Sequence, residues 1–108
     1  MPLRPSQNPS TFSRRLREVR LRSDLPQDKL GVLAGLEESS ASARMSRYEN
    51  GVHEPPHRFV EALAKVLGVP AAYFYCGDDR LAEIMLAYSD MPEIQRQALR
   101  QRAAELLR

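Results

Sequence analysis

Residues 39–51 read SSASARMSRYENG, a stretch that is short of bulky side chains. The segments on either side carry Leu, Val and Ile at helical spacing, whereas this one carries serines, alanines, two arginines and a single Met and Tyr. Met45 and Tyr48 are three positions apart, and this spacing predicts a helix over about 40–49 with both side chains in the core. The small outer residues would let such a helix approach another molecule closely.

The residues at the two ends of this helix are typical boundaries. Ser39 or Ser40 can cap its start, because a serine side chain accepts a hydrogen bond from the free N–H groups of a first turn. Asn50 and Gly51 end it, because both residues tolerate positive φ.

The outer face of the same helix carries groups suited to contacting DNA bases. Ser42, Ala43 and Arg47 lie towards the side opposite Met45 and Tyr48 at 3.6 residues per turn. Arginine is the commonest specific reader of guanine, and alanine can contact a thymine methyl group. The small side chains would fit a major groove about 12 Å wide.

Two helices are predicted before this one. The first, over about 11–22, has an apolar stripe at i, i+4, i+7, formed by Phe12, Leu16 and Val19. The second, over about 26–34, begins at Pro26, whose missing N–H suits a first turn. It directs three apolar residues inward, namely Leu30, Leu33 and Ala34. Gly35 ends it.

After the quoted stretch, a helix over about 57–67 and a short aromatic turn from Pro70 are predicted, with Tyr73, Phe74 and Tyr75 in the core. Two further helices follow. The first has an apolar stripe at i, i+3, i+4, i+7, formed by Leu81, Ile84, Met85 and Tyr88. The second starts at Asp90, with Glu93 three positions later as in a capping box. No segment alternates at period 2, so the chain is predicted to be all-α.

Length and composition exclude several classes of protein. The 108 residues suit one domain with a short extension. No run approaches about 18 apolar residues, and the N-terminus has no apolar stretch of a secretory signal. The single cysteine cannot form an internal disulfide. We therefore expect a cytoplasmic protein with no membrane segment.

Positive charge is concentrated in the first half of the chain. Residues 1–50 hold eight Arg and one Lys against six acidic residues, a balance of +3. Residues 51–108 hold six Arg and one Lys against eight acidic residues, a balance of −1. This asymmetry is compatible with nucleic-acid binding by the first half, although the net charge of +2 decides little.

Four segments together resemble the Cro/lambda-repressor-type helix-turn-helix, or XRE, family over about residues 11–75. They are LREVRLRSDLPQDKLGVLAGL, ARMSRYENG, EPP and ALAKVLGVP. The resemblance implies a five-helix, lambda-repressor-like all-α domain that binds double-stranded DNA. It further implies a sequence-specific transcriptional regulator acting as a homodimer on a palindromic operator. Repression is the expected outcome, activation stays open, and antitoxin-like and phage-repressor-like roles fit equally.

The resemblance also assigns residues. It places Gln27 at a phosphate or base edge, Asn50 at a phosphate, and Arg20 and Glu49 in a partly buried ion pair between the first and third helices. The candidate DNA-binding residues are Gln27, Ser42, Ala43, Arg44, Ser46, Arg47 and Asn50.

Two departures from the family pattern concern the front of the third helix. Nine positions separate Leu36 from Met45, where the family usually has about five, so either the turn is longer or the helix starts a turn earlier. Glu37 and Glu38 also place two acids close to the expected DNA face. They suit a helix N-terminus, and they could also accept from cytosine N4.

We expect three parts: a disordered N-terminal arm over 1–10, the DNA-binding domain over 11–77, and a helical extension over 78–108 that forms the dimer interface. Apolar residues of the extension would otherwise face water. They are Leu81, Ile84, Met85, Tyr88, Ile94, Leu99, Leu106 and Leu107. The alternative is a helical hairpin that folds back on its own domain.

Other functions find little support in the sequence. HEPPH at 53–57 matches the H-E-x-x-H zinc motif, but prolines at both x positions prevent the two histidines from sharing a helical face. No catalytic constellation stands out, so neither an enzyme nor a metal or other cofactor is expected. The competing hypothesis is a protein-interaction adaptor that keeps the fold without binding DNA, and Glu37, Glu38 and the modest net charge favour it.

Overall fold

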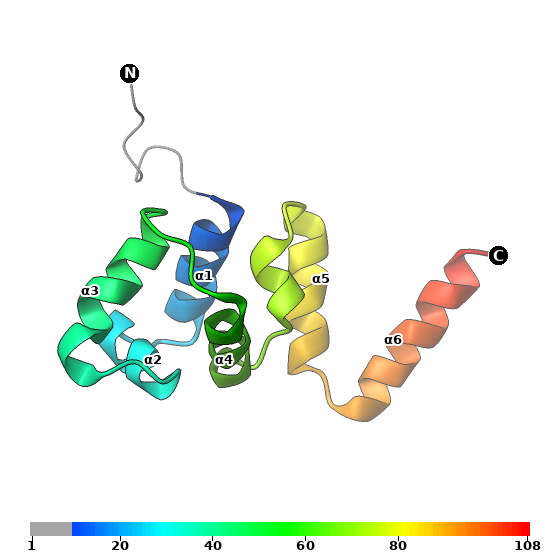
Figure 1. Cartoon of the computed structure of the whole chain (residues 1–108). Helices are drawn as coiled ribbons and strands as arrows, with labels where there is room; N and C mark the ends of the chain where they lie inside the picture. Colours follow the sequence, from blue (N-terminus) through cyan, green and yellow to red (C-terminus); the bar gives the residue numbers. More distant parts are fainter. Residues whose placement is uncertain (1–9) are drawn as a thin grey trace, which may run out of the picture.

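The computed structural model describes residues 10–108, and in this range the chain is all-helical (Figure 1), as predicted. Its elements are α1 (Thr11–Arg22), α2 (Gln27–Leu33), α3 (Glu38–Glu49), α4 (His57–Leu67), the 3-10 helix η2 (Ala71–Tyr75), α5 (Asp79–Asp90) and α6 (Glu93–Leu106). Nine of the ten residues of the predicted N-terminal arm lie outside the described range. Ser10 is the exception, and its side chain caps α1 by accepting from the backbone N–H of Ser13 at 3.1 Å.

The core is formed where α1, α2, α3, α4 and η2 meet. The predicted stripe of α1 is buried, and so are Val60 and Leu63 of α4. Of the three aromatic residues in η2, Tyr73 and Phe74 are buried, and Phe74 lies 5.4 Å from the ring of Phe12. Tyr75 was expected in the core but is exposed, because its short 3-10 helix can turn only part of its circumference towards α1.

A four-residue turn over 34–37 joins α2 to α3. Of the two possible explanations for the extra residues after Leu36, the earlier helix start is observed, because α3 begins at Glu38. The predicted serine caps were wrong, since Glu37 occupies the N-cap position and makes no side-chain capping bond. Leu33 was expected inside but is exposed, because it lies on the outer side of the short helix α2.

Close packing of α2 on α3 depends on a glycine. A Cβ at Gly31 would lie 2.9 Å from Cγ of Met45 and 3.1 Å from Cβ of Ala41. Both distances are shorter than ordinary van der Waals contact, so a larger residue here would require the neighbouring side chains or the two helices to shift. This contact holds α3 at a fixed position on α2.

The bounds predicted for α4 match the structure. Gly68 follows the helix in the left-handed conformation, with φ of 69°, a usual helix end for glycine. His57 is the first residue of α4, and His53 lies before the helix, so the two histidines do not share a helical face. Within residues 10–108, no cluster of three His, Cys, Asp or Glu side chains could hold a metal ion.

Helix α5 packs against the rest of the fold. Ala82 belongs to the buried core, and Met85 and Leu86 pack against it, whereas Leu81 and Ile84 are exposed. The predicted stripe is therefore divided between two sides of α5. Met85 is one position after Ile84, which is about 100° further around the helix, so Met85 contacts the core whereas Ile84 faces water. The packed unit extends past the predicted boundary at residue 77, and we call residues 11–90 the head.

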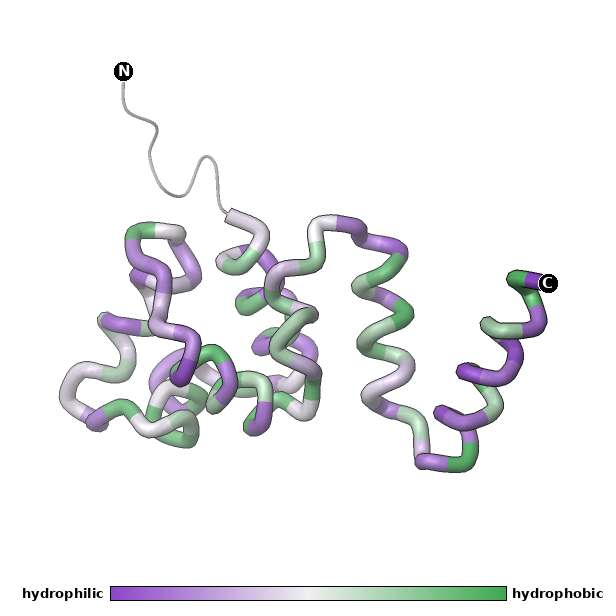
Figure 2. Tube along the Cα trace, turned by 45° about the vertical axis from the view of Figure 1, so that its right-hand side comes forward, coloured by the Kyte–Doolittle hydropathy of each residue, from purple (hydrophilic) through white to green (hydrophobic). Residues whose placement is uncertain are grey.

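Helix α6 leaves the head and buries none of its residues (Figure 1). The predicted capping by Asp90 was wrong, because Pro92 precedes the first turn and makes no side-chain capping bond. Arg96 fastens α6 to the end of α5 by donating to the carbonyl oxygens of Tyr88 and Ser89, both at 2.9 Å. Figure 2 shows hydrophobic positions along both α5 and α6, outside the packed centre of the head. In this structure α6 does not fold back on the head.

Candidate nucleic-acid interface

Helix α3 lies at one edge of the head, beside α2 (Figure 1). Its inner side consists of Ala41, Met45, Tyr48 and Glu49, all buried. Of the candidate DNA-binding residues on α3, those with exposed side chains are Ser42, Ala43, Arg44 and Arg47. Gln27 at the start of α2, Ser46 and Asn50 are half-buried. The fold thus presents one side of α3 to solvent along its length.

Ser39 belongs to this exposed face but was not among the predicted residues. It lies four positions before Ala43 and eight before Arg47, so the three share one ridge of the helix. The prediction missed it because the helix was expected to begin at 40, which placed Ser39 in a cap. The structure makes it part of the first turn.

The C-terminal half of α3 borders a hollow of about 220 Å³. Arg44, Arg47 and Tyr48 line it from the helix, and His53, Glu54 and Pro56 line it from the following loop. The guanidinium of Arg44 donates to the hydroxyl of Tyr48 at 3.1 Å. The two arginines therefore border the same hollow at the end of the helix, and the carboxylate of Glu54 borders it as well.

Two other candidate residues contact each other. The side-chain amide of Asn50 donates to the hydroxyl of Ser46 at 3.2 Å. Asn50 is also the C-cap of α3, where its backbone N–H donates to the carbonyl oxygen of Ser46 at 2.9 Å. These bonds restrict Asn50 to one orientation next to the exposed face.

The expected ion pair between Arg20 and Glu49 is present. Nε of Arg20 lies 2.6 Å from Oε2 of Glu49, and Nη2 lies 3.0 Å from Oε1, so the contact is bidentate. The side chain of Glu49 is only 1% exposed and that of Arg20 is 11% exposed. Arg20 also donates to the carbonyl oxygen of Leu25 at 2.9 Å. It therefore ties α1 both to the end of α3 and to the segment before α2.

The two acids that depart from the family pattern are located at the start of α3. Glu37 precedes the helix and Glu38 is its first residue, while Arg47 is in its last turn. Negative charge at a helix N-terminus and positive charge at its C-terminus are both favoured by the macrodipole. The acids thus have a structural reason to be near the interface.

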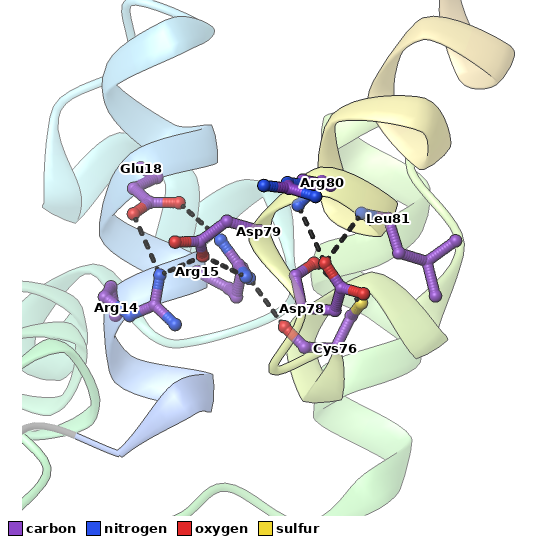
Figure 3. A network of polar contacts seen from close by, with 8 residues as sticks. All are labelled: Arg14, Arg15, Glu18, Cys76, Asp78, Asp79, Arg80 and Leu81. Atoms are coloured by element: carbon purple, nitrogen blue, oxygen red, sulfur yellow. Dashed lines mark hydrogen bonds and ion pairs between the residues drawn. The ribbon is translucent and has the colours of Figure 1, made fainter.

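A second buried arginine was missed entirely. Arg15 is 3% exposed, and its guanidinium contacts Asp79 at 2.8 Å, the carbonyl oxygen of Cys76 at 2.9 Å and Glu18 at 3.1 Å (Figure 3). Arg14 also contacts Asp79, at 2.9 Å. Helical spacing places Arg15 on the apolar side of α1, three positions after Phe12 and four before Val19, and this signal could have identified it. Its partners Cys76 and Asp79 could not be found in this way, because they come from a segment about sixty residues later.

These contacts shift two pKa values. Hydrogen bonds from Arg14 and then Arg15 lower the pKa of Asp79 below its ordinary value. Burial alone would lower the pKa of Arg15, but its hydrogen bonds to Asp79 and Glu18, with their charges, raise it. Each charge in this cluster favours the ionised form of the other.

The expected dimer residues have different environments. Leu81, Ile84, Ile94, Leu106 and Leu107 are exposed, and Tyr88 and Leu99 are half-buried. Met85 instead packs against the core of the head. The exposed members lie along α5 and α6 without cover from the chain itself.

Comparison with known proteins gives two similarities. Residues 11–73 match the family model described as a helix-turn-helix domain. The crystal structure of the transcriptional regulator BswR is 43% identical, with a TM-score of 0.83, and the match covers 88% of this chain and 94% of that chain. A comparison with curated proteins gave no match. Within residues 10–108, no helix is long and apolar enough to cross a membrane.

Proposed function

Because the chain belongs to the helix-turn-helix family of DNA-binding transcriptional regulators, we propose that it reads a palindromic operator as a homodimer of the Cro/lambda-repressor (XRE) type. It acts in the cytoplasm as a repressor, by occupying the operator. A regulator of this family binds DNA and is not an enzyme.

The exposed face of α3 carries this proposal. Ser39, Ala43 and Arg47 follow one another along a single ridge, and Ser42 is exposed beside it. The side chains before Arg47 are small, so the helix axis can come close to base edges. Arg47 then reaches furthest and donates two parallel hydrogen bonds to guanine O6 and N7.

Neighbouring groups hold the duplex in register. Arg44 and His53 border the hollow beside Arg47 and face the adjacent phosphates. Gln27, at the start of α2, and Asn50, at the end of α3, contact the DNA backbone. Phosphate contacts of this kind fix position without reading sequence, so they should contribute equally to all DNA sites.

Dimerisation follows from the small size of the reading surface. One such helix contacts only a few base pairs, and two half-sites are needed for useful specificity. A two-fold symmetric dimer on a palindromic operator needs its two copies of α3 about 34 Å apart, one turn of DNA. The exposed apolar residues of α5 and α6 supply the self-complementary surface.

Selection of bound fragments from random duplex DNA tests this function. We expect enrichment of an inverted repeat. On that site Arg47→Ala should cost about 1–3 kcal/mol and relax preference at one base position of each half-site. Arg80→Ala removes another exposed arginine, from α5, and should leave the base preference unchanged.

Two outcomes contradict the proposal. If no sequence is enriched, the chain is an adaptor that keeps the fold without reading DNA. If Arg47→Ala binds the enriched site as tightly and as selectively as the unchanged protein, α3 does not read bases through this residue.

A further inference from the structure

Helices α1 and α5 are joined by charged contacts at both of their ends. At the N-terminal ends of the two helices, the carboxylate of Asp79 accepts hydrogen bonds from Arg14 and Arg15 (Figure 3). At their C-terminal ends, Arg22 of α1 forms an ion pair with Asp90 of α5. The two contacts are seven or eight positions apart on α1 and eleven apart on α5, and the two helices run in the same direction (Figure 1).

Apolar packing alone would hold α5 less firmly. Ala82, Met85 and Leu86 contact the core, but apolar contacts are non-directional and allow a helix to slide or rotate. Hydrogen bonds between guanidinium and carboxylate groups have a defined geometry and restrict both movements. Because Arg15 is buried, it also requires a partner, and Asp79 is the acid that reaches it from α5.

The direction of α5 matters because α6 continues from it. Arg96 binds the last carbonyl groups of α5 and lies 5.2 Å from the ring centre of Tyr88, so α6 follows any tilt of α5. A 12-residue helix is about 18 Å long, so a tilt of about 10° moves its far end by about 3 Å. That movement is close to the rise of one base pair, about 3.4 Å.

We propose that Asp79 and Asp90 are positioning residues that set the spacing between the two DNA half-sites, by fixing the direction of α5 relative to the reading helix α3. This inference rests on the proposed homodimer. The charged contacts of α1 with α5 set the separation of the two copies of α3, and α3 itself supplies the base contacts.

The test measures affinity for a series of palindromic duplexes whose central spacer differs by one base pair at a time. The unchanged protein should prefer its best spacer over the neighbouring ones by about tenfold, and Asp79→Asn should reduce that preference to about twofold. Affinity for a single half-site should stay the same, because α3 is unchanged. A purely stabilising role for Asp79 would instead lower affinity equally for every spacer.

Further variants separate charge from geometry. Arg22→Asp should broaden the spacer preference. The double variant Arg22→Asp with Asp90→Arg should restore it, because the ion pair forms again with its two charges exchanged between the helices. Glu83→Gln removes a carboxylate from the same helix that forms no ion pair with any other residue of 10–108, so it should keep the original preference. Arg22 and Asp90 are surface residues, so this exchange remains usable if Asp79→Asn unfolds, as judged by circular dichroism.

The outcomes distinguish the two proposals. If the unchanged protein is monomeric or shows no spacer preference, the proposed homodimer fails, and the positioning role fails with it. If the unchanged protein shows a sharp optimum and folded Asp79→Asn and Arg22→Asp variants keep it, only the positioning role is wrong.

Discussion

The head and α6 differ in what covers their apolar residues. Val60 and Leu63 of α4 are fully buried by other helices of the head. Ile94 and Leu107, in and just after α6, are 77% and 89% exposed. A chain of this size supplies covering partners for one core only. In the proposed homodimer, a second copy of the chain would cover these residues of α6.

One ion pair of the head differs from the ion pair of α6 in the same way. Glu49 is buried against Arg20 in the head, whereas Glu105 contacts Arg102 of α6 at 3.5 Å with both side chains largely in water. Solvent weakens an exposed pair, while a buried pair must stay complete because each charge has lost its hydration. Breaking the Arg20–Glu49 pair should therefore lower the stability of the fold strongly, and breaking the Arg102–Glu105 pair only weakly.

Removal of α6 should have the largest effect. A chain ended after Asp90 keeps α5 and its contacts with α1, so it should remain folded and sediment as a monomer. Operator affinity should fall by about 10²–10⁴-fold, because linked half-site contacts are lost. Analytical ultracentrifugation and fluorescence anisotropy measure the two effects.

A shorter chain provides the control. Ending after Gly77 also removes Ala82 and leaves Arg15 without Asp79, so this fragment should be much less stable to urea than the one ended after Asp90. If the chain ended after Asp90 still sediments as a dimer, the interface lies in the head.

Breaking the buried ion pair should have the next largest effect. Glu49→Ala leaves Arg20 without its partner, and we expect a loss of about 3–5 kcal/mol in the free energy of unfolding. Glu105→Ala removes a carboxylate from α6 and should change stability by less than about 0.5 kcal/mol. Urea denaturation of both variants makes the comparison, and equal losses would contradict the difference between the regions.

The contact of α2 with α3 should respond less strongly. Gly31→Val introduces a branched side chain where even a Cβ is crowded by Met45 and Ala41, so we expect a loss of about 1–3 kcal/mol. Ala104→Val makes a similar enlargement on exposed α6 and should cost about 0.5 kcal/mol or less, through helix propensity. Thermal unfolding measures both, and a stable Gly31→Val variant would show that α3 can move away from α2.

The smallest effect should be the pH dependence that Asp79 confers. Its pKa is lowered in the folded protein from an ordinary value of 3.8. The ionised form is therefore favoured by folding, and its contribution is present above about pH 4 and lost as the pH falls through the folded-state pKa. The difference in unfolding free energy between the unchanged protein and Asp79→Asn should shrink over that range. A difference that stays constant down to pH 2 would show that Asp79 is not stabilised by its arginines.

The sequence by itself determined the all-α class, most helix bounds and the character of α3. The helical period is local, so Phe12, Leu16 and Val19 identify the buried side of α1 without knowledge of any neighbour. The small residues, Arg47 and the family-like motifs of 11–75 likewise indicated a helix-turn-helix surface before any fold was known. The residue-level DNA contacts stay predictions.

Only the tertiary structure decided the remaining features, because they depend on which distant segments meet. The need for Gly31 arises from the approach of Met45, and the burial of Arg15 depends on Asp79, which follows 64 positions later. The start of α3 at Glu38 and the inward position of Met85 also depend on which parts of the chain meet in the fold. A periodic pattern shows which residues share a side of a helix, whereas the energy that chooses the covered side comes from burial against elements remote in sequence.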